Sequence, residues 1–327
     1  MEAISVIIPT FNRVVLLRRA IESVLAAVED IDEIIVVDDG STDGTEALVN
    51  SFGDRIRYIK TPNRGAGAAR NTGIKTSSHD LVAFADSDDE WLPEKMTIQR
   101  PLMSANRSLV FCFSDFGQLY PDGKREPHYL IHWHEDTRGW DKILGPGSWY
   151  SEILPLPGDQ TDFRVHTGSL YRAELRTSYI NVNTLLVRKS LAGSSFYFAE
   201  DLPTYEDWDC FAKLSRLGIC AYLDFDTALQ RSHGGPRLTN SSTLICTQTR
   251  IISVLRNWSV DRDFMKLHGR EVNKLLAQLR RRNVGLLLKH GRADEARTLI
   301  PTLQGRYIEW LVIRIYVILV RFLRWRR

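Results

Sequence analysis

The sequence predicts an α/β fold, in which a mostly parallel central sheet is flanked by helices and followed by an all-helical C-terminal extension. Short, continuously apolar runs alternate with helical patterns over the first 110 residues. Polar, Asp-rich loops follow these runs, and beyond Ser241 the apolar residues keep a helical spacing. Strands that alternate with helices are typical of a parallel sheet with helices on both faces.

Four short runs are the predicted strands of the first half. The first two are continuously apolar and rich in Val and Ile, as is typical of a strand buried on both faces. Helical patterns lie between them, with apolar residues such as Leu17, Ile21 and Val24 on one side of the first helix. The predicted strands are residues 4–10, 32–37, 55–61 and 80–85, and the predicted helices are residues 16–28, 45–52 and 63–77.

The second half is less regular. Strand-like runs cover residues 109–120 and 178–187, with a long polar loop between them. A helix is predicted over residues 206–218, where Gly218 is a suitable stop, and a strand follows over residues 219–224. We expect this half to complete the same sheet and to receive a second substrate.

The chain contains 43% apolar and 25% charged residues, which is ordinary for a globular protein with a real core. Its four cysteines form no CxxC pair, which argues against a zinc finger or a disulfide framework and favours buried thiols in a reducing compartment. The N-terminus lacks a signal-peptide pattern, so a cytoplasmic location is expected. Residues 251–327 carry 17 basic and 6 acidic side chains, a net of +11, although the whole chain is only at +3.

Three polar loops follow predicted strands at the edge where ligands of parallel sheets bind. They are "TFNR" at residues 10–13, "DDGSTDGT" at residues 38–45 and "DSDD" at residues 86–89. Crowded carboxylates repel one another unless a cation or hydrogen-bond donors offset the charge. A GxGxxG dinucleotide motif and a P-loop are both missing. The pattern therefore favours a nucleotide whose diphosphate is held through Mg²⁺ or Mn²⁺ over a Rossmann dinucleotide site or a P-loop site.

Together "VIIPTFNR", "VVDDGSTDGT", "GAGAARNTGI" and "FADSDD" resemble the family 2 glycosyltransferases, which have the GT-A fold, a Rossmann-like α/β architecture. The order and spacing of the motifs match over about 90 residues. The resemblance implies a nucleotide-diphosphate sugar as donor, a DxD-type site for Mn²⁺ or Mg²⁺, and transfer with inversion at the anomeric carbon.

The resemblance also implies roles for individual residues. Asp39 would accept a hydrogen bond from the nucleobase, Arg70 would lie near the diphosphate, and Asp88 would bind the metal. The imide N–H of a uracil-type base is a donor that suits a carboxylate. The implied donor-binding residues are Pro9, Thr10, Phe11, Arg13, Asp39, Arg70, Asp86 and Ser87.

Some of these residue types have simpler explanations. Asp38 and Asp43 are also suited to capping turns and helices, a common use of Asp in loops. Arg64 and Arg70 could be solvated surface charges.

Inverting transfer needs a base that takes the proton of the acceptor hydroxyl. The stretch "YEDWD" resembles the family's "ED" element, which assigns Asp207 as the catalytic base and Glu206 to substrate binding. The alternative is that Glu206, Asp207 and Asp209 are acids favoured by the helix dipole at a helix start. Trp208 could stack on a sugar, but a core position is the commoner use of such a tryptophan.

Late in the fold, "SHGGPR" offers His233 as a second metal ligand and Arg237 as a contact to the diphosphate. The glycine pair between them could act as a hinge for a loop that closes over the donor.

The C-terminal residues 307–327 form an apolar segment with Arg314 near its middle. Residues 307–325 would make a helix about 28 Å long, close to the thickness of a bilayer core, but the charges make spanning marginal. We expect an amphipathic helix at the membrane surface, with its arginines near anionic lipids. The alternative is a helix docked on the protein or on a second subunit.

The predicted organisation has four parts, which are a donor-binding half (1–110), an acceptor and base half (111–240), a helical extension (241–306) and a membrane-interface helix (307–327). The predicted function is an inverting, metal-dependent glycosyltransferase at the inner face of the cell membrane, acting in surface polysaccharide or glycolipid assembly. A UDP-sugar is the favoured donor, a glycan or polyprenyl-linked molecule the acceptor, and no nucleic acid is involved. The alternatives are a nucleotidyltransferase of related fold and a non-catalytic nucleotide-sugar-binding protein.

Overall fold

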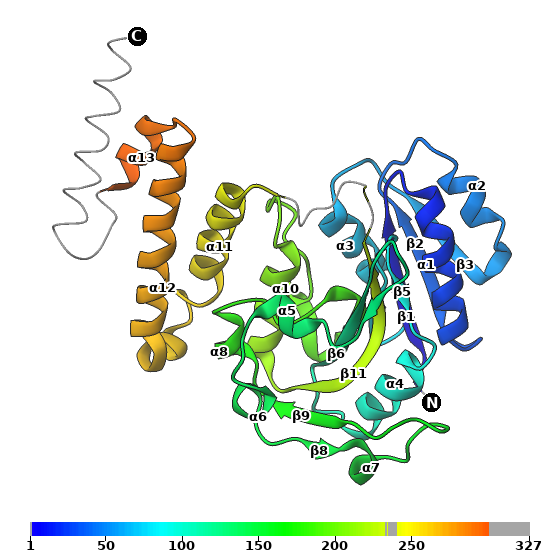
Figure 1. Cartoon of the computed structure of the whole chain (residues 1–327). Coiled ribbons are helices and arrows are strands. Elements are labelled where there is room, and N and C mark those ends of the chain that lie inside the picture. Colours follow the sequence, from blue (N-terminus) through cyan, green and yellow to red (C-terminus); the bar gives the residue numbers. More distant parts are fainter. Residues whose placement is uncertain (1, 233, 235–240, 301–327) are drawn as a thin grey trace. The chain divides into compact units, whose positions relative to one another are not determined.

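The computed structural model describes residues 2–232, 234 and 241–300 (Figure 1). The chain divides into two compact units. The first comprises residues 1–201 and 206–235, and the second comprises residues 202–205 and 236–327. The predicted boundary at residue 110 would lie within the sheet of the first unit and stays a prediction.

One mixed sheet forms the centre of the first unit, with strand order β3-β2-β1-β4-β10-β6-β11-β9-β8. Strands β1 to β4 are mutually parallel, and β10 runs antiparallel to its neighbours β4 and β6. The strands are β1 (Ile4–Thr10), β2 (Glu33–Asp38), β3 (Ile56–Lys60), β4 (Leu81–Phe84), β5 (Glu90–Trp91), β6 (Phe111–Leu119), β7 (Arg125–Glu126), β8 (Ser148–Trp149), β9 (Arg164–Gly168), β10 (Leu186–Arg188) and β11 (Cys220–Arg231).

Helices flank this sheet, as Figure 1 shows for α1, α3, α4 and α10. The longer ones are α1 (Val14–Ala27), α2 (Thr45–Asn50), α3 (Ala66–Thr76), α4 (Lys95–Ala105) and α10 (Glu206–Leu217). One-turn helices interrupt the long connection of the second half, namely α5 (Leu130–His134), α6 (Trp140–Ile143), α7 (Tyr150–Ile153), α8 (Tyr171–Glu174) and α9 (Lys189–Ala192). The predicted mostly parallel α/β architecture is confirmed.

The first helices pack as their sequences predict. The apolar side of α1 is fully buried at Leu17, Ile21 and Val24. Helix α3 lies very close to β1, because a Cβ added at Gly73 would come within 2.4 Å of the Ile7 side chain. Only glycine leaves room for the Ile7 side chain at this position. The contact places the C-terminal half of α3 against the middle of β1.

The predicted strand over residues 178–187 is wrong for most of its length. Residues 182–184 form a 3₁₀ turn, and regular strand begins only at Leu186. The Asn181 side chain accepts a hydrogen bond from the Asn183 N–H at 2.9 Å, which closes the turn locally. Asn side chains compete with the sheet for backbone donors in this way, so the apolar pattern alone was misleading.

Three helices make up residues 243–299 of the second unit, as predicted for the C-terminal extension. They are α11 (Thr243–Asn257), α12 (Arg262–Lys289) and α13 (Ala293–Leu299). Ser242 and Asp261 cap the starts of α11 and α12 through their side chains. Gly291, in the left-handed conformation at φ 74°, lies in the turn between α12 and α13.

The described residues include no helix that is both long and apolar enough to cross a membrane. The predicted membrane-interface helix, residues 307–327, lies outside the described part of the chain.

Candidate active site

The three polar loops predicted to meet do so, at the carboxyl edge of β1, β2 and β4. The Asn12 N–H donates to Ser41 Oγ at 2.8 Å, and the Asn12 side chain accepts from the Thr42 N–H at 2.8 Å. Arg13 Nη1 lies 2.8 Å from Asp88 Oδ2, which joins the first loop to the third. Parallel strands place their carboxyl ends at one edge, so this convergence follows from the topology.

Asp39 holds the loop before α3. Its carboxylate accepts hydrogen bonds from the N–H groups of Arg64, at 2.8 Å, and Gly65, at 2.7 Å. Burial and the neighbouring Asp38 raise the pKa of Asp39, although these two N–H groups work in the opposite direction. Gly65 has φ 92°, a conformation that favours glycine. The carboxylate and the start of α3 are therefore fixed together.

Asp38 and Asp43 have structural partners. Asp38 accepts hydrogen bonds from the Ser41 N–H and the Tyr58 hydroxyl, at 2.8 and 2.5 Å. Asp43 accepts from the N–H groups of Val14 and Thr45, at the starts of α1 and α2. These contacts agree with the capping roles considered for both residues.

Three of the implied donor-binding residues lie at the end of β1 and just beyond it. Pro9 and Thr10 are its last two residues, and Phe11 follows with 43% of its surface exposed. Thr10 is buried, and its hydroxyl has no hydrogen-bond partner among the described residues. An unpaired buried hydroxyl and an exposed ring at one strand end suit a polar, aromatic ligand.

Within the acidic loop, specific donors offset the charge of the three carboxylates. Asp86 Oδ1 accepts from Arg70 at 2.8 Å, and Arg13 pairs with Asp88. Asp89 accepts from the Asn183 side chain at 2.9 Å and from the Arg231 N–H at 3.0 Å. Hydrogen-bond donors and two arginines therefore make the crowded negative charge tolerable.

The donor set of this loop fits a hard divalent cation. The carboxylates of Asp86 and Asp88 are two residues apart, and their side chains are 24% and 10% exposed. The loop between them is fixed, because the Asp86 N–H donates to the Asn183 side chain at 2.6 Å and Ser87 is buried. Carboxylate oxygens on a fixed loop are the ligands that Mg²⁺ and Mn²⁺ prefer.

Arg70 joins the acidic loop to the start of α10. Its guanidinium, 5% exposed, contacts Asp86 at 2.8 Å and Glu206 at 3.0 Å, and it lies 5.1 Å from the centre of the Phe198 ring. Burial alone would lower the pKa of Arg70, but the two carboxylates outweigh it and raise the pKa. Arg70 is thus a buried cation shared by two carboxylates, and both contacts are internal to the protein.

Asp207, the predicted base, is half-buried in the first turn of α10. Burial and the adjacent Glu206 raise its pKa to about 7, although Arg70 opposes the shift. The next residue, Trp208, is fully buried and donates from its indole to the Glu174 carbonyl oxygen at 2.9 Å. Trp208 therefore anchors α10 in the core, which was the simpler of its two predicted roles.

The structure brings together the predicted residues of both halves, with two exceptions. His233 and Arg237 lie outside the described residues, so the second metal ligand and the second diphosphate contact stay predictions.

Two residues that contact the site were not predicted from the sequence, namely Asn183 and Glu200. Asn183 bonds to both Asp86 and Asp89, while Glu200 pairs with Arg64 and accepts from Asn71 at 3.0 Å. Both residues lie about 100 positions or more from their partners along the chain. The pair of asparagines in "NVNT" was the only local signal, and it was hidden in a strand-like pattern.

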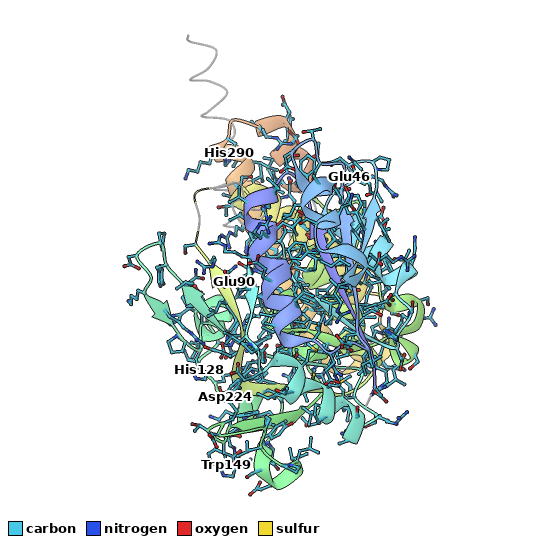
Figure 2. All side chains as sticks on the ribbon, turned by 90° about the vertical axis from the view of Figure 1, so that its right-hand side faces the viewer. Glu46, Glu90, His128, Trp149, Asp224 and His290 are labelled. Carbon is cyan, nitrogen blue, oxygen red and sulfur yellow. The ribbon has the colours of Figure 1, made fainter. Side chains whose placement is uncertain are left out.

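A second polar cluster, at Asp115, His128 and Asp224, was also not predicted. Figure 2 labels two of its members, His128 and Asp224. Its ligand atoms lie within 4.8 Å of one another, so the three residues could hold a metal ion. Hydrogen bonds to Asp115 and Asp224 raise the pKa of His128 to about 10, so a protonated His128 offsets part of the charge of the two carboxylates. A depression of about 470 Å³ adjoins it, lined by Glu94, Arg125, His128, Gln160, Asp224 and Asp226 among others.

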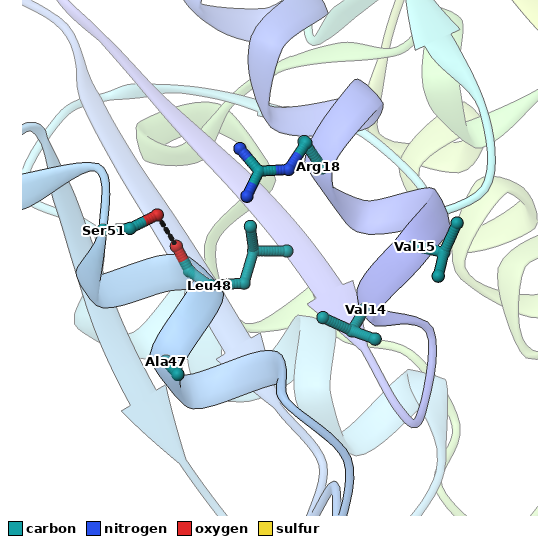
Figure 3. A pocket seen from close by; sticks show the side chains of 6 residues that line it. All are labelled: Val14, Val15, Arg18, Ala47, Leu48 and Ser51. Carbon is teal, nitrogen blue, oxygen red and sulfur yellow. Dashed lines mark hydrogen bonds between the residues drawn. The ribbon is translucent and has the colours of Figure 1, made fainter.

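Another depression, of about 510 Å³, lies between α1 and α2. Figure 3 shows its lining, which is mostly aliphatic, with Arg18 at one side. None of the predicted site residues lines it. Its position therefore does not suggest a part in the chemistry.

Comparison with known proteins gives a family and a fold. The model of "Glycosyl transferase family 2" matches residues 5–178, just over half of the chain. The chain is 40% identical over 123 residues to an uncharacterized glycosyltransferase of Rickettsia felis, covering 37% of this chain and 20% of that protein. It is 35% identical over 124 residues to the putative teichuronic acid biosynthesis glycosyltransferase TuaG of Bacillus subtilis, covering 37% and 49%. The chain thus spans only about a fifth of the first relatives found.

Two solved structures have a similar fold at low sequence identity. TarS 1–349 of S. aureus, in complex with UDP-GlcNAc, matches with a TM-score of 0.59 at 18% identity, over 96% of this chain and 79% of that one. Mannosyltransferase PcManGT from Pyrobaculum calidifontis, in complex with GDP-Man and Mn²⁺, matches with a TM-score of 0.55 at 16% identity, over 96% and 84%.

Proposed function

The chain belongs to glycosyl transferase family 2, and we propose that it transfers a sugar from a nucleotide diphosphate to an acceptor with inversion and with help from a divalent cation. The observation that carries the proposal is the position of Arg70. This one guanidinium contacts Asp86 of the acidic loop and Glu206, the residue before the predicted base. Arg70 therefore links the proposed phosphate and metal site to the helix start that carries the proposed base.

The donor binds at the carboxyl edge of β1, β2 and β4. Asp39 accepts from the nucleobase, and Thr10 and Phe11 line the base pocket. Asp88 would hold Mn²⁺ or Mg²⁺, with Asp86 beside it in the donor site, and the ion would offset the charge that develops on the leaving diphosphate. A UDP-sugar is the favoured donor, and UDP-GlcNAc and GDP-Man in the two similar structures support a nucleotide sugar.

Asp207 removes the proton from the acceptor hydroxyl. A pKa raised to about 7 gives this carboxylate the basicity that the step needs near neutral pH, while part of it remains ionised. The attacking hydroxyl reaches the anomeric carbon from the face opposite the leaving nucleotide, so the configuration inverts. Trp208 and Glu174 fix the helix start and thereby the position of the base.

We further propose a glycan or polyprenyl-linked acceptor and a place in surface polysaccharide or glycolipid assembly at the inner face of the cell membrane. The relative TuaG, named for teichuronic acid biosynthesis, supports the first part. The basic, apolar residues 307–327 support the membrane location.

The experiment measures UDP affinity by calorimetry in Mn²⁺, and UDP release from a panel of UDP-sugars. Asp88→Asn should weaken UDP binding about tenfold or more and remove its dependence on Mn²⁺, because a metal ligand is lost. Asp207→Asn should keep the affinity for UDP but lower UDP release about 10²-fold or more, the usual contribution of a general base.

Asp54→Asn is the matched control, because Asp54 is exposed in the turn before β3 and has no assigned role. If Asp207→Asn retains full turnover, the base assignment is wrong. If wild-type protein binds UDP in Mn²⁺ but releases none from any UDP-sugar, a non-catalytic binding protein is favoured. Release of diphosphate from a nucleoside triphosphate would instead favour a nucleotidyltransferase.

A further inference from the structure

Helix α12 carries a basic stripe along one exposed side. Successive residues of an α-helix are rotated by about 100°, so Lys266, Arg270, Lys274 and Arg281 fall within about 80° of arc. The first three are exposed and the fourth is half-buried. The stripe extends over about 22 Å at 1.5 Å per residue.

The stripe lies on the side of α12 opposite its buried face. Val272, Leu276 and Leu279 are buried, and their helical positions are roughly 160° away from the centre of the stripe. The basic residues therefore do not take part in packing of the helical unit.

Ion pairs leave two neighbouring cations of the stripe available. Asp263 is the acid within its arc, and it pairs with Lys266 at 2.9 Å. Among the described residues, no ion pair joins Arg270 or Lys274 to a carboxylate. These two cations, one turn apart on a straight helix, produce a field that attracts a flat or extended anion.

Two exposed apolar side chains accompany the cations. Leu267 is 81% exposed in the first turns of α12, and Val260 is 61% exposed in the turn before the helix. Exposed aliphatic groups beside a row of cations are the combination with which amphipathic helices bind the surface of anionic membranes. A soluble polyanion would use the cations but would gain little from Leu267 and Val260.

We propose that the α12 stripe, Lys266, Arg270, Lys274 and Arg281, is a docking surface for an anionic membrane. This proposal rests on the membrane location proposed above. The stripe would give the chain a second membrane contact, beside that of residues 307–327, which are apolar and rich in Arg. The stripe binds lipid phosphates through its cations, and Leu267 and Val260 insert at the headgroup level.

The test is co-sedimentation of the full chain with phosphatidylcholine vesicles, with and without phosphatidylglycerol. The variant Arg270→Gln/Lys274→Gln removes two cations and keeps good helix formers. Each lysine or arginine near an anionic surface contributes about fivefold in affinity, so the variant should bind the anionic vesicles about 25-fold more weakly. Binding to pure phosphatidylcholine should not change.

The matched control is Lys75→Gln/Lys124→Gln, which makes the same change in net charge at exposed lysines of the first unit. Equal losses in both double variants would mean that only net charge matters and would overturn the proposal. So would a stripe variant that loses binding to heparin but keeps its binding to vesicles. UDP affinity in Mn²⁺ is measured on the same samples, so a failed donor site is distinguished from a failed docking surface.

Discussion

At the scale of single residues, Asp207 and Glu206 show how neighbouring carboxylates can take different roles. Glu206 is paired with Arg70 at 3.0 Å, which holds its charge in place. Asp207 has no such direct pair in the described contacts and lies half-buried beside that charge, so its pKa rises to about 7. A negative charge nearby disfavours a second one, so Glu206 raises the pKa of Asp207.

The rate should therefore depend on pH through Asp207. Because the base acts in its deprotonated form, kcat/KM should rise about tenfold per pH unit below pH 7 and level off above it. Glu206→Gln removes the neighbouring negative charge and leaves Arg70 closer to unopposed, so the pKa of Asp207 falls. The midpoint of the profile should then move to lower pH, and a midpoint that moves to higher pH would contradict this electrostatic account.

Lys95 is a buried amine outside the site. It is fully buried, donates to the Gln99 side chain at 2.6 Å and lies 4.9 Å from the centre of the Trp91 ring. Burial lowers its pKa to about 7. The unfolded chain therefore binds more protons than the folded one between about pH 7 and the normal lysine pKa near 10.4, so stability rises with pH across that range.

The variant Lys95→Met/Gln99→Leu should weaken this dependence. Its stability at pH 7 should fall by about 1–3 kcal/mol, because Gln99 also donates to the buried Thr184 carbonyl oxygen at 2.7 Å and the variant leaves this oxygen without its donor. Urea unfolding from pH 7 to pH 10 measures the slope, which in the wild type should approach about 1.4 kcal/mol per pH unit. An equal slope in the two proteins would show that Lys95 is already charged in the folded state.

At the scale of elements, the contact between α3 and β1 depends on Gly73. A Cβ at this position would lie 2.4 Å from Ile7 Cγ2 and 2.9 Å from Ile7 Cγ1, and Ile7 itself is fully buried. Neither backbone has room to move, because Asp39 fixes the loop before α3.

Gly73→Ala should lower the free energy of unfolding by about 1–3 kcal/mol, the usual cost of overpacking in a core. Gly285→Ala in α12 is the matched control, since nothing lies within 4 Å of its added Cβ. That variant should stabilise the helix by about 0.5–1 kcal/mol. Urea unfolding of both variants checks the pair, and destabilisation by both would mean that the space at Gly73 is not the cause.

Elements with a strong local pattern could be predicted from the sequence. The runs at β1, β2 and β4 are apolar on both faces, and the loops after them carry the motifs, so their meeting at one edge followed from parallel pairing. Residues 178–185 could not be placed in this way, because Asn181 and Asn183 satisfy backbone and carboxylate groups by contacts within the turn and with Asp86 and Asp89.

The candidate site was predictable to a similar extent. Asp39, Asp86, Asp88 and Asp207 stood out by motif, and the structure brings their loops and helix together. The double role of Arg70 did not stand out, because Glu206 lies 136 positions away in the sequence. An ion pair across such a distance leaves no local signal in the sequence. The resemblance suggested only that Arg70 contacts the diphosphate.

At the scale of the whole molecule, charge is divided along the chain. Residues 251–327 carry a net charge of +11, and the remainder carries −8. The acidic part contains the donor edge and the second polar cluster, while the basic part contains α12 and the C-terminal segment. This division agrees with the proposed function, in which the basic part binds an anionic membrane and the acidic part binds the metal and the donor.

Deletion of residues 307–327 should move the protein from the membrane pellet to the supernatant when cells are fractionated in high salt. In low salt, part of the truncated protein should stay in the pellet, because the α12 stripe binds mainly through its cations and salt screens their attraction to the lipid phosphates. UDP affinity should not change. A truncated protein that pellets equally in high salt would show that the anchor lies elsewhere in the chain.

The guanidinium of Arg70 has an evolutionary consequence. Because it serves Asp86 and Glu206 at once, a substitution that adapts the acidic loop to another donor also disturbs the environment of the base. Under the proposed function, relatives that use another donor sugar should therefore also differ in the residues around α10 that set the pKa of the base.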